Sequence, residues 1–285
     1  HKVLSNILYR RLIKYTEKEI GNYQCGFRPN RSKIEQIFTL RHILQKTREY
    51  NITTYHLFID FKSAYDTVNR QQLYTAMEEL NIPVKLIKVI QMTMKSTKCL
   101  VRIQSTLTEK FESNTGLRQG DALACLLFNI VLEKAIRESG IQRTNTIYYK
   151  STQLLAYADD IDIIARSINA LKEAFTSLET SAKKMGLKIN EEKTKYMISC
   201  PNKMRNINSL SDHIQIGDYK FEQVNSFTYL GSQVNKENDV SSEIKKRIIA
   251  ANRCYYGLKK HIKSKLLTIK SKIIIYKTLI RPVLT

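Results

Sequence analysis

The segment that most restricts the fold is a pair of short apolar runs separated by acidic residues, within residues 153–165. Leu154-Leu155-Ala156-Tyr157 precedes the acids and Ile161-Asp162-Ile163-Ile164 follows them. Two such arms joined by Ala158-Asp159-Asp160 are typical of a β-hairpin with acids at its tip. An Asp-Asp pair is usually no more than a turn or a cap, but a hairpin tip holds its carboxylates rigidly. The chain is therefore expected to build a sheet that presents two acids at one end.

A further acid, Asp60, ends another apolar run, Leu57-Phe58-Ile59, which predicts a strand over 55–60. If this strand and the hairpin are neighbours in one sheet, three carboxylates converge. Their mutual repulsion would raise the pKa of at least one of them, so the arrangement makes sense mainly with cations between them. Oxygen ligands indicate hard ions, Mg²⁺ or Mn²⁺, and a two-ion site is typical of phosphoryl transfer. One ion would activate an attacking hydroxyl and the other would neutralise a leaving pyrophosphate.

The remaining pattern mixes helices and strands without regular alternation, which favours an α+β layered fold over a doubly wound sheet. Ser32 is a candidate N-cap, and Gly186 is expected to close a helix at its C-terminal end. Either Ser241 or Ser242 is a candidate N-cap for a basic helix near the C-terminus. We expect helices over 4–20, 34–50, 73–80, 84–94, 121–138 and 170–185, and strands over 100–103, 110–112, 195–199, 219–221 and 227–230.

Composition excludes several classes of protein. The chain has 285 residues, is 42% hydrophobic and contains only 9 Gly and 4 Pro, so it can bury a core and is neither collagen-like nor disordered. The longest apolar stretch, residues 122–132, is shorter than the roughly 20 residues that a membrane span needs, so a soluble protein is expected. The five cysteines are widely spaced, which indicates neither a disulfide framework nor a zinc site and favours a reducing, intracellular compartment.

The net charge of +21 is concentrated at the two ends of the chain. Residues 1–50 carry 11 basic and 4 acidic side chains, and residues 241–285 carry 12 basic and one acidic, which leaves a net +3 for the residues between. Opposed basic walls around a nearly neutral middle suit a groove that follows a phosphate backbone. Charge alone leaves two other interpretations open, which are solubility and binding to an anionic membrane.

Several motifs occur in the order and at the spacing of those in reverse transcriptases. They are Phe58-Ile59-Asp60-Phe61-Lys62-Ser63-Ala64-Tyr65-Asp66, Gly116-Leu117-Arg118-Gln119-Gly120-Asp121, Tyr157-Ala158-Asp159-Asp160, Gly186-Leu187-Lys188-Ile189-Asn190 with Lys193-Thr194, and Tyr229-Leu230-Gly231-Ser232. The loop over residues 24–31 also resembles the front of this domain in non-LTR retrotransposons. From about residue 23 to its C-terminus, the chain is therefore similar to the reverse transcriptase domain of a non-LTR retrotransposon polyprotein.

This resemblance implies a right-hand polymerase fold, with fingers, a palm built on an antiparallel sheet, and a partial helical thumb. The fingers would comprise residues 1–50 and 68–115, and the palm residues 51–67 and 116–235. The thumb would comprise residues 236–285 and would be incomplete, as expected for a polymerase domain cut from a longer polyprotein.

The resemblance also implies roles for individual residues. Asp60, Asp159 and Asp160 would be the catalytic acids and metal ligands, with the carbonyl of Phe61 as a further ligand. Tyr65 would crowd the sugar 2′ position and so favour deoxynucleotides; the alternative is a core tyrosine. The other candidates are Lys62, Gln119, Gly120 and Lys193 for the nucleotide, and Arg28, Arg31, Tyr157, Leu230, Gly231, Lys245, Lys246 and Arg253 for nucleic acid.

Two of these groups have simpler alternatives. Lys193 would approach the pyrophosphate, or it is one member of the charged turn Glu191-Glu192-Lys193. Arg28, Arg31 and Lys62 would contact phosphate, or they are solvated surface residues.

The function that the resemblance implies is an RNA-directed DNA polymerase. It would extend a primer 3′-hydroxyl with dNTPs on an RNA template, using two Mg²⁺ ions or Mn²⁺. Its partners would be an RNA template, a DNA primer and dNTPs, with no membrane, and it would work in the nucleus. The endonuclease is expected on a separate part of the parent polyprotein, and no constellation for it or for ribonuclease H is found here. The alternatives are a catalytically silent nucleic-acid-binding remnant and an RNA-dependent RNA polymerase, against which Tyr65 argues.

Overall fold

The chain forms two compact units. The computed structural model describes residues 2–95, 97–118, 120–141, 147, 150–200 and 212–284. The N-terminal unit comprises residues 1–225 and the C-terminal unit residues 226–285.

A six-stranded sheet organises the N-terminal unit, with the strand order β6-β7-β1-β8-β10-β9. All neighbouring pairs are antiparallel except β8 and β10, which are parallel, so the sheet is mixed rather than antiparallel as the sequence predicted. The parallel pair arises because β10 reaches the sheet as the second strand of a hairpin with β9. The strands are β1 (Thr54–Ile59), β6 (Thr152–Tyr157), β7 (Asp160–Ala165), β8 (Lys195–Ser199), β9 (His213–Ile216) and β10 (Tyr219–Gln223).

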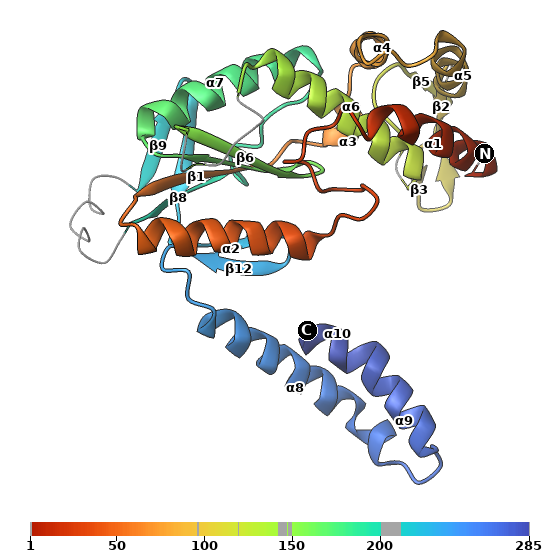
Figure 1. Ribbon diagram of the computed structural model, residues 1–285. Helices are drawn as coiled ribbons and strands as arrows, with labels where there is room; N and C mark the ends of the chain where they lie inside the picture. The colour runs from red at the N-terminus through yellow and green to blue at the C-terminus, as the bar shows by residue number, and fades with distance from the viewer. Residues whose placement is uncertain are drawn as a thin grey trace. The chain divides into compact units, whose positions relative to one another are not determined.

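Helices cover both faces of this sheet. In Figure 1, α6 (Ala122–Glu138) and α7 (Ile168–Lys184) lie on one face, and α2 (Lys33–Glu49) runs along the other. The predicted cap of α2 is confirmed, since Ser32 and Glu35 form a capping box. The predicted end of α7 is also confirmed, because Gly186 follows it with a positive φ of 86°. The apolar faces of α6, α7 and the sheet enclose a large core, with Leu57, Phe128, Phe175 and Phe221 among its buried side chains.

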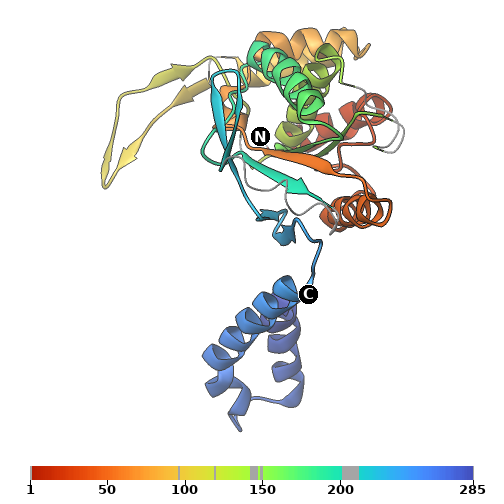
Figure 2. The ribbon, with the colours of Figure 1, turned by 90° about the vertical axis from the view of Figure 1, so that its left-hand side faces the viewer.

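Further elements extend from this core. They are α1 (Lys2–Thr16), α3 (Ala64–Thr67), α4 (Arg70–Glu79), α5 (Val84–Met94) and a hairpin arm in which β2 (Thr97–Cys99) pairs with β5 (Phe111–Ser113) and β3 (Arg102–Ile103) pairs with β4 (Thr106–Leu107). The arm projects from the helices in Figure 2. Its base is fixed by Arg70, whose guanidinium donates hydrogen bonds to the backbone carbonyls of Met94, Ser113, Thr115 and Gly116.

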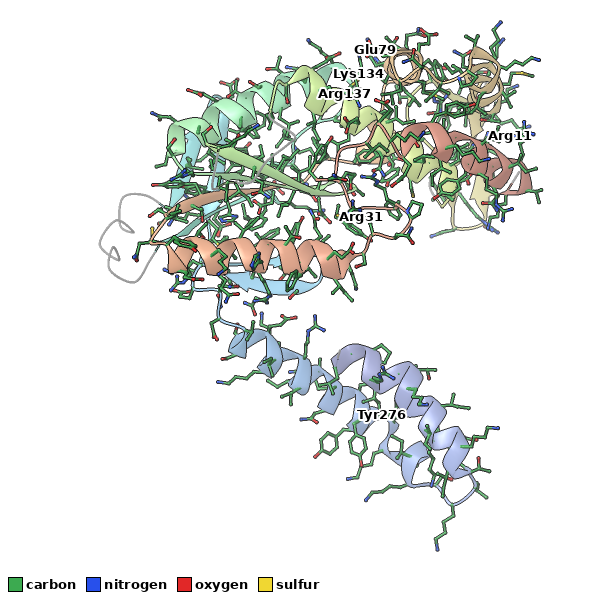
Figure 3. All side chains as sticks on the ribbon, viewed as in Figure 1. Arg11, Arg31, Glu79, Lys134, Arg137 and Tyr276 are labelled. Carbon is green, nitrogen blue, oxygen red and sulfur yellow. The ribbon has the colours of Figure 1, made fainter. Side chains whose placement is uncertain are left out.

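Ion pairs join α6 to its neighbours, and Figure 3 labels Lys134 and Arg137 of α6 and Glu79 of α4. Lys134 contacts Glu79 of α4 at 2.5 Å. Arg137 contacts the buried Glu133 at 2.7 Å and Glu19 of the N-terminal segment at 3.0 Å. Because Glu133 is buried, its pairing with Arg137 compensates a carboxylate that would otherwise be costly to bury.

The C-terminal unit contains a hairpin and a helical stretch. The hairpin consists of β11 (Ser226–Tyr229) and β12 (Ser232–Asn235), and the helices are α8 (Ser241–Lys263), α9 (Ile269–Ile275), the π-helix η2 (Tyr276–Ile280) and α10 (Arg281–Leu284). Neither Ser241 nor Ser242 caps α8. Instead, the Asp239 carboxylate accepts hydrogen bonds from the N–H and the hydroxyl of Ser241, because an acid is favourable at a helix N-terminus.

The division at residue 225 groups the β11–β12 hairpin with the C-terminal helices. The sequence assigned this hairpin to the palm; the boundaries of fingers, palm and thumb stay predictions. Among the described residues, no helix is both long and apolar enough to cross a membrane.

Candidate active site

The three acids meet at one end of the sheet because β1 and β7 are neighbours. Their antiparallel register ends with Ile59 opposite Ile161, so the next step of that register sets Asp60 opposite Asp160. Asp159 lies in the two-residue turn between β6 and β7, which the pair Tyr157 and Asp160 closes. The predicted convergence of two strand ends is thus observed. It depends on tertiary pairing between segments a hundred residues apart.

The electrostatics of this cluster show that its negative charges interact. The pKa of Asp159 is raised, mainly by burial and also by the charge of Asp60, although Lys193 opposes the shift. Burial, followed by the charges of Asp159 and Asp60, raises the pKa of Asp160 to about 6. Within the described residues, no group of three or more His, Cys, Asp or Glu side chains is arranged to hold a metal ion. The donor set is nevertheless one of hard oxygen ligands whose repulsion a divalent cation would relieve.

Asn190 and Thr194, in the segment that follows α7, fix the position of Asp60. The Asn190 side chain donates a hydrogen bond to the Asp60 carboxylate at 3.0 Å, and the Asn190 backbone N–H donates to the Asp60 carbonyl at 2.8 Å. The Asp60 N–H donates to the Thr194 hydroxyl at 3.2 Å. Three hydrogen bonds from one short segment therefore set both the backbone and the carboxylate of Asp60.

The backbone of Phe61 also faces the acids. Phe61 forms an antiparallel bridge with Ile189, and the hydrogen bonds around this bridge are made by Lys62 to Lys188 and by Asn190 to Asp60. In that pattern, the N–H and C=O of the central residue point away from the bridging segment. The Phe61 carbonyl therefore points to the β7 side of β1, where Asp159 and Asp160 lie.

Lys193 lies beside the cluster. Its Nζ is 4.0 Å from a carboxylate oxygen of Asp60, and its side chain is 71% exposed. An ion pair this exposed contributes little to stability. The ammonium group is therefore available to a ligand that enters the site, and this leaves the predicted pyrophosphate contact possible in geometry.

Tyr65 packs against α6 next to the acids. Its ring stacks on Phe128 with the centroids 4.8 Å apart. Burial, followed by the neighbouring Cys125 thiol and the charge of Asp159, raises the pKa of its hydroxyl. Since the charge of Asp159 contributes to this shift, the phenol lies near the turn that carries Asp159. The structure thus shows a ring packed against Phe128, and the predicted contact of Tyr65 with the sugar stays a prediction.

The remaining nucleotide candidates are less informative. Lys62 is exposed next to the Phe61 bridge. Gly120 has a positive φ of 82° and has open space where a Cβ would lie. Gln119 lies outside the described residues, so its predicted role stays a prediction.

The prediction that Arg28 contacts phosphate is wrong in this structure. The guanidinium is buried and pairs with the Glu17 carboxylate at 2.8 Å. It also donates hydrogen bonds to the backbone carbonyls of Glu17, Gly21 and Gln24. With its donors used inside the protein, Arg28 stabilises the front loop instead of presenting charge to solvent.

Arg31 and Tyr157 keep partly free surfaces. Arg31 is exposed and donates to the Asn22 side chain at 3.0 Å. The ring of Tyr157 lies 6.3 Å from that of Phe27, so two aromatic faces flank the catalytic turn. Both residues stay candidates for nucleic-acid contact.

The other nucleic-acid candidates belong to the C-terminal unit. Leu230 and Gly231 form the two-residue turn of the β11–β12 hairpin, and both have positive φ, 50° and 84°. Lys245, Lys246 and Arg253 are exposed on α8.

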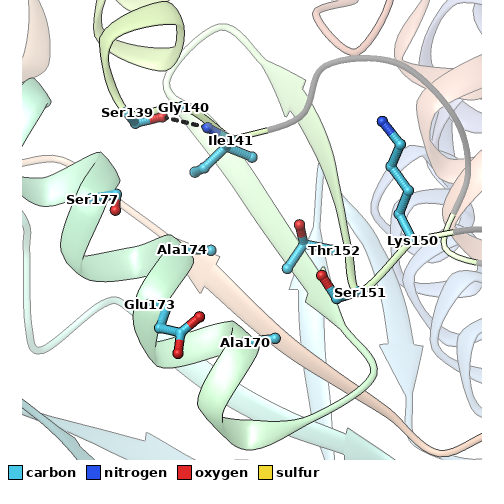
Figure 4. A pocket seen from close by; sticks show the side chains of 10 residues that line it. All are labelled: Ser139, Gly140, Ile141, Lys150, Ser151, Thr152, Ala170, Glu173, Ala174 and Ser177. Atoms are coloured by element: carbon cyan, nitrogen blue, oxygen red, sulfur yellow. Dashed lines mark hydrogen bonds between the residues drawn. The ribbon is translucent and has the colours of Figure 1, made fainter.

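A polar pocket of about 560 Å³ lies elsewhere on the N-terminal unit (Figure 4). The segment that follows α6, the start of β6 and one side of α7 line it, and they contribute Ser139, Thr152 and Glu173 among other residues. Thr152 begins β6 and Tyr157 ends it, which separates the pocket from the acid cluster by about 17 Å at roughly 3.3 Å per residue. This pocket is therefore distinct from the candidate active site.

Sequence reasoning assigned no role to Asn190, Thr194 or Gln24. Asn190 and Thr194 are hydrogen-bonded to Asp60, and Gln24 is hydrogen-bonded to Ala158 in the turn that carries Asp159. Asn190 and Thr194 lie within the motif recognised after Gly186, which was the available signal. Gln24 opens the front loop, and its partner is 134 residues away, so no local pattern identifies it.

Comparison with known proteins gives consistent relatives. The chain is 25% identical over 250 residues to the "Probable RNA-directed DNA polymerase from transposon BS" of Drosophila melanogaster, which is 84% of this chain and 26% of that protein. It is 24% identical over 197 residues to the "Transposon TX1 uncharacterized 149 kDa protein" of Xenopus laevis, 68% of this chain and 15% of the other. A Pol polyprotein from a type-1 R2 element of Nasonia vitripennis is 22% identical over 195 residues, 67% and 19% of the two chains. The chain thus spans about a quarter or less of these relatives.

Solved structures share the fold. Telomerase from Candida tropicalis in complex with a fragment of telomeric RNA superposes with a TM-score of 0.60 and 18% identity, covering 98% of this chain and 44% of the telomerase. The apo form of that telomerase gives a TM-score of 0.57 and 18% identity over 85% of this chain and 41% of its own. The right-hand polymerase fold expected from the sequence is thereby confirmed.

The family profile described as "Reverse transcriptase (RNA-dependent DNA polymerase)" matches residues 1–234. This match includes the acid cluster, its supporting segment after α7 and the front loop. Together with the retrotransposon relatives, it confirms the resemblance to non-LTR elements. The chain therefore belongs to the reverse transcriptase family of nucleotidyltransferases.

Proposed function

We propose that this chain extends the 3′-hydroxyl of a DNA primer with dNTPs on an RNA template, as part of retrotransposition. The observation that carries the proposal is the convergence of Asp60, Asp159 and Asp160 at adjacent strand ends, where burial and then their mutual charge raise the pKa of Asp159 and Asp160. Carboxylates that repel one another destabilise a fold, and groups with such perturbed pKa values gather at functional sites. The family match indicates which function this cluster serves.

Two divalent cations, Mg²⁺ or Mn²⁺, are the cofactors in this proposal. Asp60, Asp159, Asp160 and the Phe61 carbonyl would hold them, since all four supply the oxygen donors that these ions prefer. Bound there, the ions would lower the pKa of the attacking hydroxyl and neutralise the leaving pyrophosphate. Asn190 would keep the Asp60 carboxylate oriented while metal and substrate bind, as hydrogen bonds behind metal ligands commonly do.

Other residues act on the incoming nucleotide. Lys193, 4.0 Å from Asp60, would donate a hydrogen bond or a proton to the pyrophosphate as it leaves. Tyr65, held against Phe128, would occupy the space that a ribose 2′-hydroxyl needs and so select dNTPs. Lys62, Gln119 and Gly120 would line the same pocket.

Nucleic acid would be held mainly by charge. Arg31, Lys245, Lys246 and Arg253 would contact phosphates, which gives affinity that does not depend on base sequence. Tyr157 would contact the primer–template next to the catalytic turn, and Leu230 and Gly231 would grip the primer strand. As part of the same proposal, the enzyme would work on chromosomal DNA in the nucleus, with the endonuclease on another part of the parent polyprotein.

The proposal is tested by extension of a DNA primer on an RNA template, with Mg²⁺ or Mn²⁺ and with dNTPs or NTPs. We expect incorporation of dNTPs that requires the metal and is absent in Asp159→Ala. Binding of the primer–template without incorporation under either metal would identify a catalytically silent nucleic-acid-binding protein. Incorporation of NTPs in preference to dNTPs would identify an RNA polymerase.

The sugar selection attributed to Tyr65 has its own test. Tyr65→Val removes the ring, so the variant should incorporate NTPs at a higher rate relative to dNTPs than the parent chain. An unchanged ratio in a folded variant would restrict Tyr65 to core packing against Phe128.

A further inference from the structure

The turn that carries Asp159 has an unusual backbone. Ala158 has a φ of 56°, in the left-handed region that favours glycine, and its side chain is only 3% exposed. Two-residue hairpin turns with a positive φ at the first position normally place Gly there. A residue other than glycine persists in this conformation only where its surroundings impose it. Something other than the local sequence therefore holds this turn.

The side chain of Gln24 makes that contact. Its Oε1 accepts a hydrogen bond from the Ala158 N–H at 2.8 Å, and its Nε2 donates to the Ala158 carbonyl at 3.1 Å. The same Oε1 accepts from the Gly26 N–H at 2.7 Å. Gln24 is 1% exposed, so water does not compete with these bonds. One amide thus binds both polar groups of the strained residue.

The front loop packs against the β6–β7 hairpin, which brings the Gln24 side chain to Ala158. Gln24 bridges Ala156 in a parallel pairing, with the Cys25 N–H donating to the Ala156 carbonyl and the Ala156 N–H donating to the Tyr23 carbonyl. Gly26 permits the close approach, because a Cβ there would lie 2.2 Å from the Ala158 nitrogen. The buried Asn129 of α6 donates to the Gly26 carbonyl at 2.8 Å and fixes the loop from the other side.

We propose that Gln24 is a positioning residue that fixes the Ala158 peptide groups and thereby the direction of the Asp159 and Asp160 carboxylates. This inference rests on the proposed function, because it assigns Gln24 to the geometry of the polymerase site. The side-chain amide of Gln24 is hydrogen-bonded to Ala158 and Gly26, so Gln24 would act through the turn. Its loss should weaken metal binding and slow nucleotide addition, because small displacements of reacting groups reduce rates steeply.

The variant that tests this is Gln24→Met in the intact chain, which keeps the side-chain length and removes both hydrogen-bonding atoms. Gln36→Met is a matched control. Gln36 is also buried, and its amide donates to the Ala156 carbonyl at 3.3 Å and the Tyr23 carbonyl at 3.5 Å without touching the turn. Both variants lose a buried amide against the same strand, and only one loses contact with Ala158.

Three quantities are measured on each chain: Mn²⁺ affinity from the electron paramagnetic resonance signal of free Mn²⁺, kcat for addition of one dNTP, and the midpoint of thermal unfolding. We expect Gln24→Met to lower Mn²⁺ affinity and kcat each by about 10- to 100-fold, as for loss of a residue that orients metal ligands. Gln36→Met should lower the unfolding midpoint similarly and leave both other quantities near those of the parent chain. Equal effects of the two variants on Mn²⁺ affinity and kcat would overturn the positioning role.

A rescue variant tests the same point independently of folding losses. Glycine adopts the positive φ of residue 158 without strain, so Ala158→Gly in the Gln24→Met background should restore part of the Mn²⁺ affinity. No restoration in a folded double variant would contradict the role of the turn conformation. If the parent chain adds no nucleotide, the proposed function fails, while the Mn²⁺ titrations still decide whether Gln24 positions the acids.

Discussion

The two units of the chain differ in how they use apolar and charged residues. The N-terminal unit buries a continuous core and carries a net charge of +11 over 225 residues. The C-terminal unit carries nearly the same net charge, +10, in 60 residues, and the only apolar side chains buried among those described are Tyr229, Val234, Ala251 and Ile280. Large apolar side chains stay exposed there, Leu266 at 94% and Ile269 at 77% among them.

This difference follows from two separate demands. Carboxylates that repel one another keep a fixed geometry only on a rigid, well-packed frame, which is what β1, β7 and their covering helices provide. A surface that follows a phosphate backbone needs positive charge and tolerates a thin core, because its affinity comes from counterion release. We therefore propose that the first unit carries out the chemistry and that the second binds nucleic acid.

The largest effect is expected from Asp159→Ala. Loss of a metal-holding carboxylate should lower kcat by more than about 100-fold, because loss of the residues behind such ligands already costs 10- to 100-fold. Affinity for a primer–template duplex should not fall, since the change removes a negative charge from the site. Rapid-quench kinetics and fluorescence anisotropy measure the two quantities. If affinity for the duplex fell by as large a factor as kcat, the N-terminal unit would supply most of the binding to nucleic acid.

Core substitutions in the two units should differ strongly. Leu57 of β1 is completely buried, and Leu57→Ala should destabilise the protein by about 2 to 5 kcal/mol. Leu266→Ala should change the free energy of unfolding by less than about 0.5 kcal/mol, as for exposed positions in general. Urea unfolding followed by circular dichroism measures both. A large cost for Leu266→Ala would mean that the apolar surface of the C-terminal unit is packed in solution.

Charge removal tests the grip directly. Replacing Lys245, Lys246 and Arg253 by Ala should weaken duplex binding uniformly across sequences. The slope of log affinity against log salt concentration should fall by about 3, or roughly one unit for each lost phosphate contact. Arg28→Lys offers a contrast, because Arg28 is buried against Glu17 and its replacement should leave the slope unchanged. A slope that is equal in the triple variant and the parent chain would remove α8 from the nucleic-acid interface.

The smallest effect concerns pH and the metal-free protein. The folded-state pKa of Asp160 is about 6 against an ordinary value of 3.8, so the folded state binds the proton more tightly than the unfolded state. The free energy of unfolding therefore falls as pH rises from about 4 to 6, and the destabilisation persists above that range. Asp160→Asn should raise the unfolding midpoint in EDTA near pH 7.5 and leave it unchanged near pH 4. If Asp160→Asn and the parent chain had the same unfolding midpoint at pH 7.5 as well as at pH 4, this would contradict the cost of the charged Asp160 carboxylate that burial and its acidic neighbours produce.

Local features of the fold were predictable from the sequence. The acidic hairpin tip, the Ser32 cap and the helix end before Gly186 are each encoded in a few neighbouring residues. The arrangement of β8 and β10 was not predictable, because the parallel pairing depends on how distant segments enter the sheet.

The candidate site divides in the same way. Its acids could be found because each lies at or directly beside the end of an apolar strand. The partners of Arg28, Asp60 and Ala158 could not, because Glu17, Asn190 and Gln24 reach them through tertiary packing that no local pattern records.

The central claim is that the acids of the N-terminal unit carry out RNA-templated addition of deoxynucleotides. The most direct measurement is single-nucleotide addition to a DNA primer annealed to RNA, by the parent chain and by Asp159→Ala at saturating primer–template. We expect the parent chain to add the complementary dNTP rapidly with Mg²⁺. Asp159→Ala should bind the duplex and add no dNTP. Addition at equal rates by both chains, or no addition by the parent chain with Mg²⁺ or Mn²⁺, would contradict this claim.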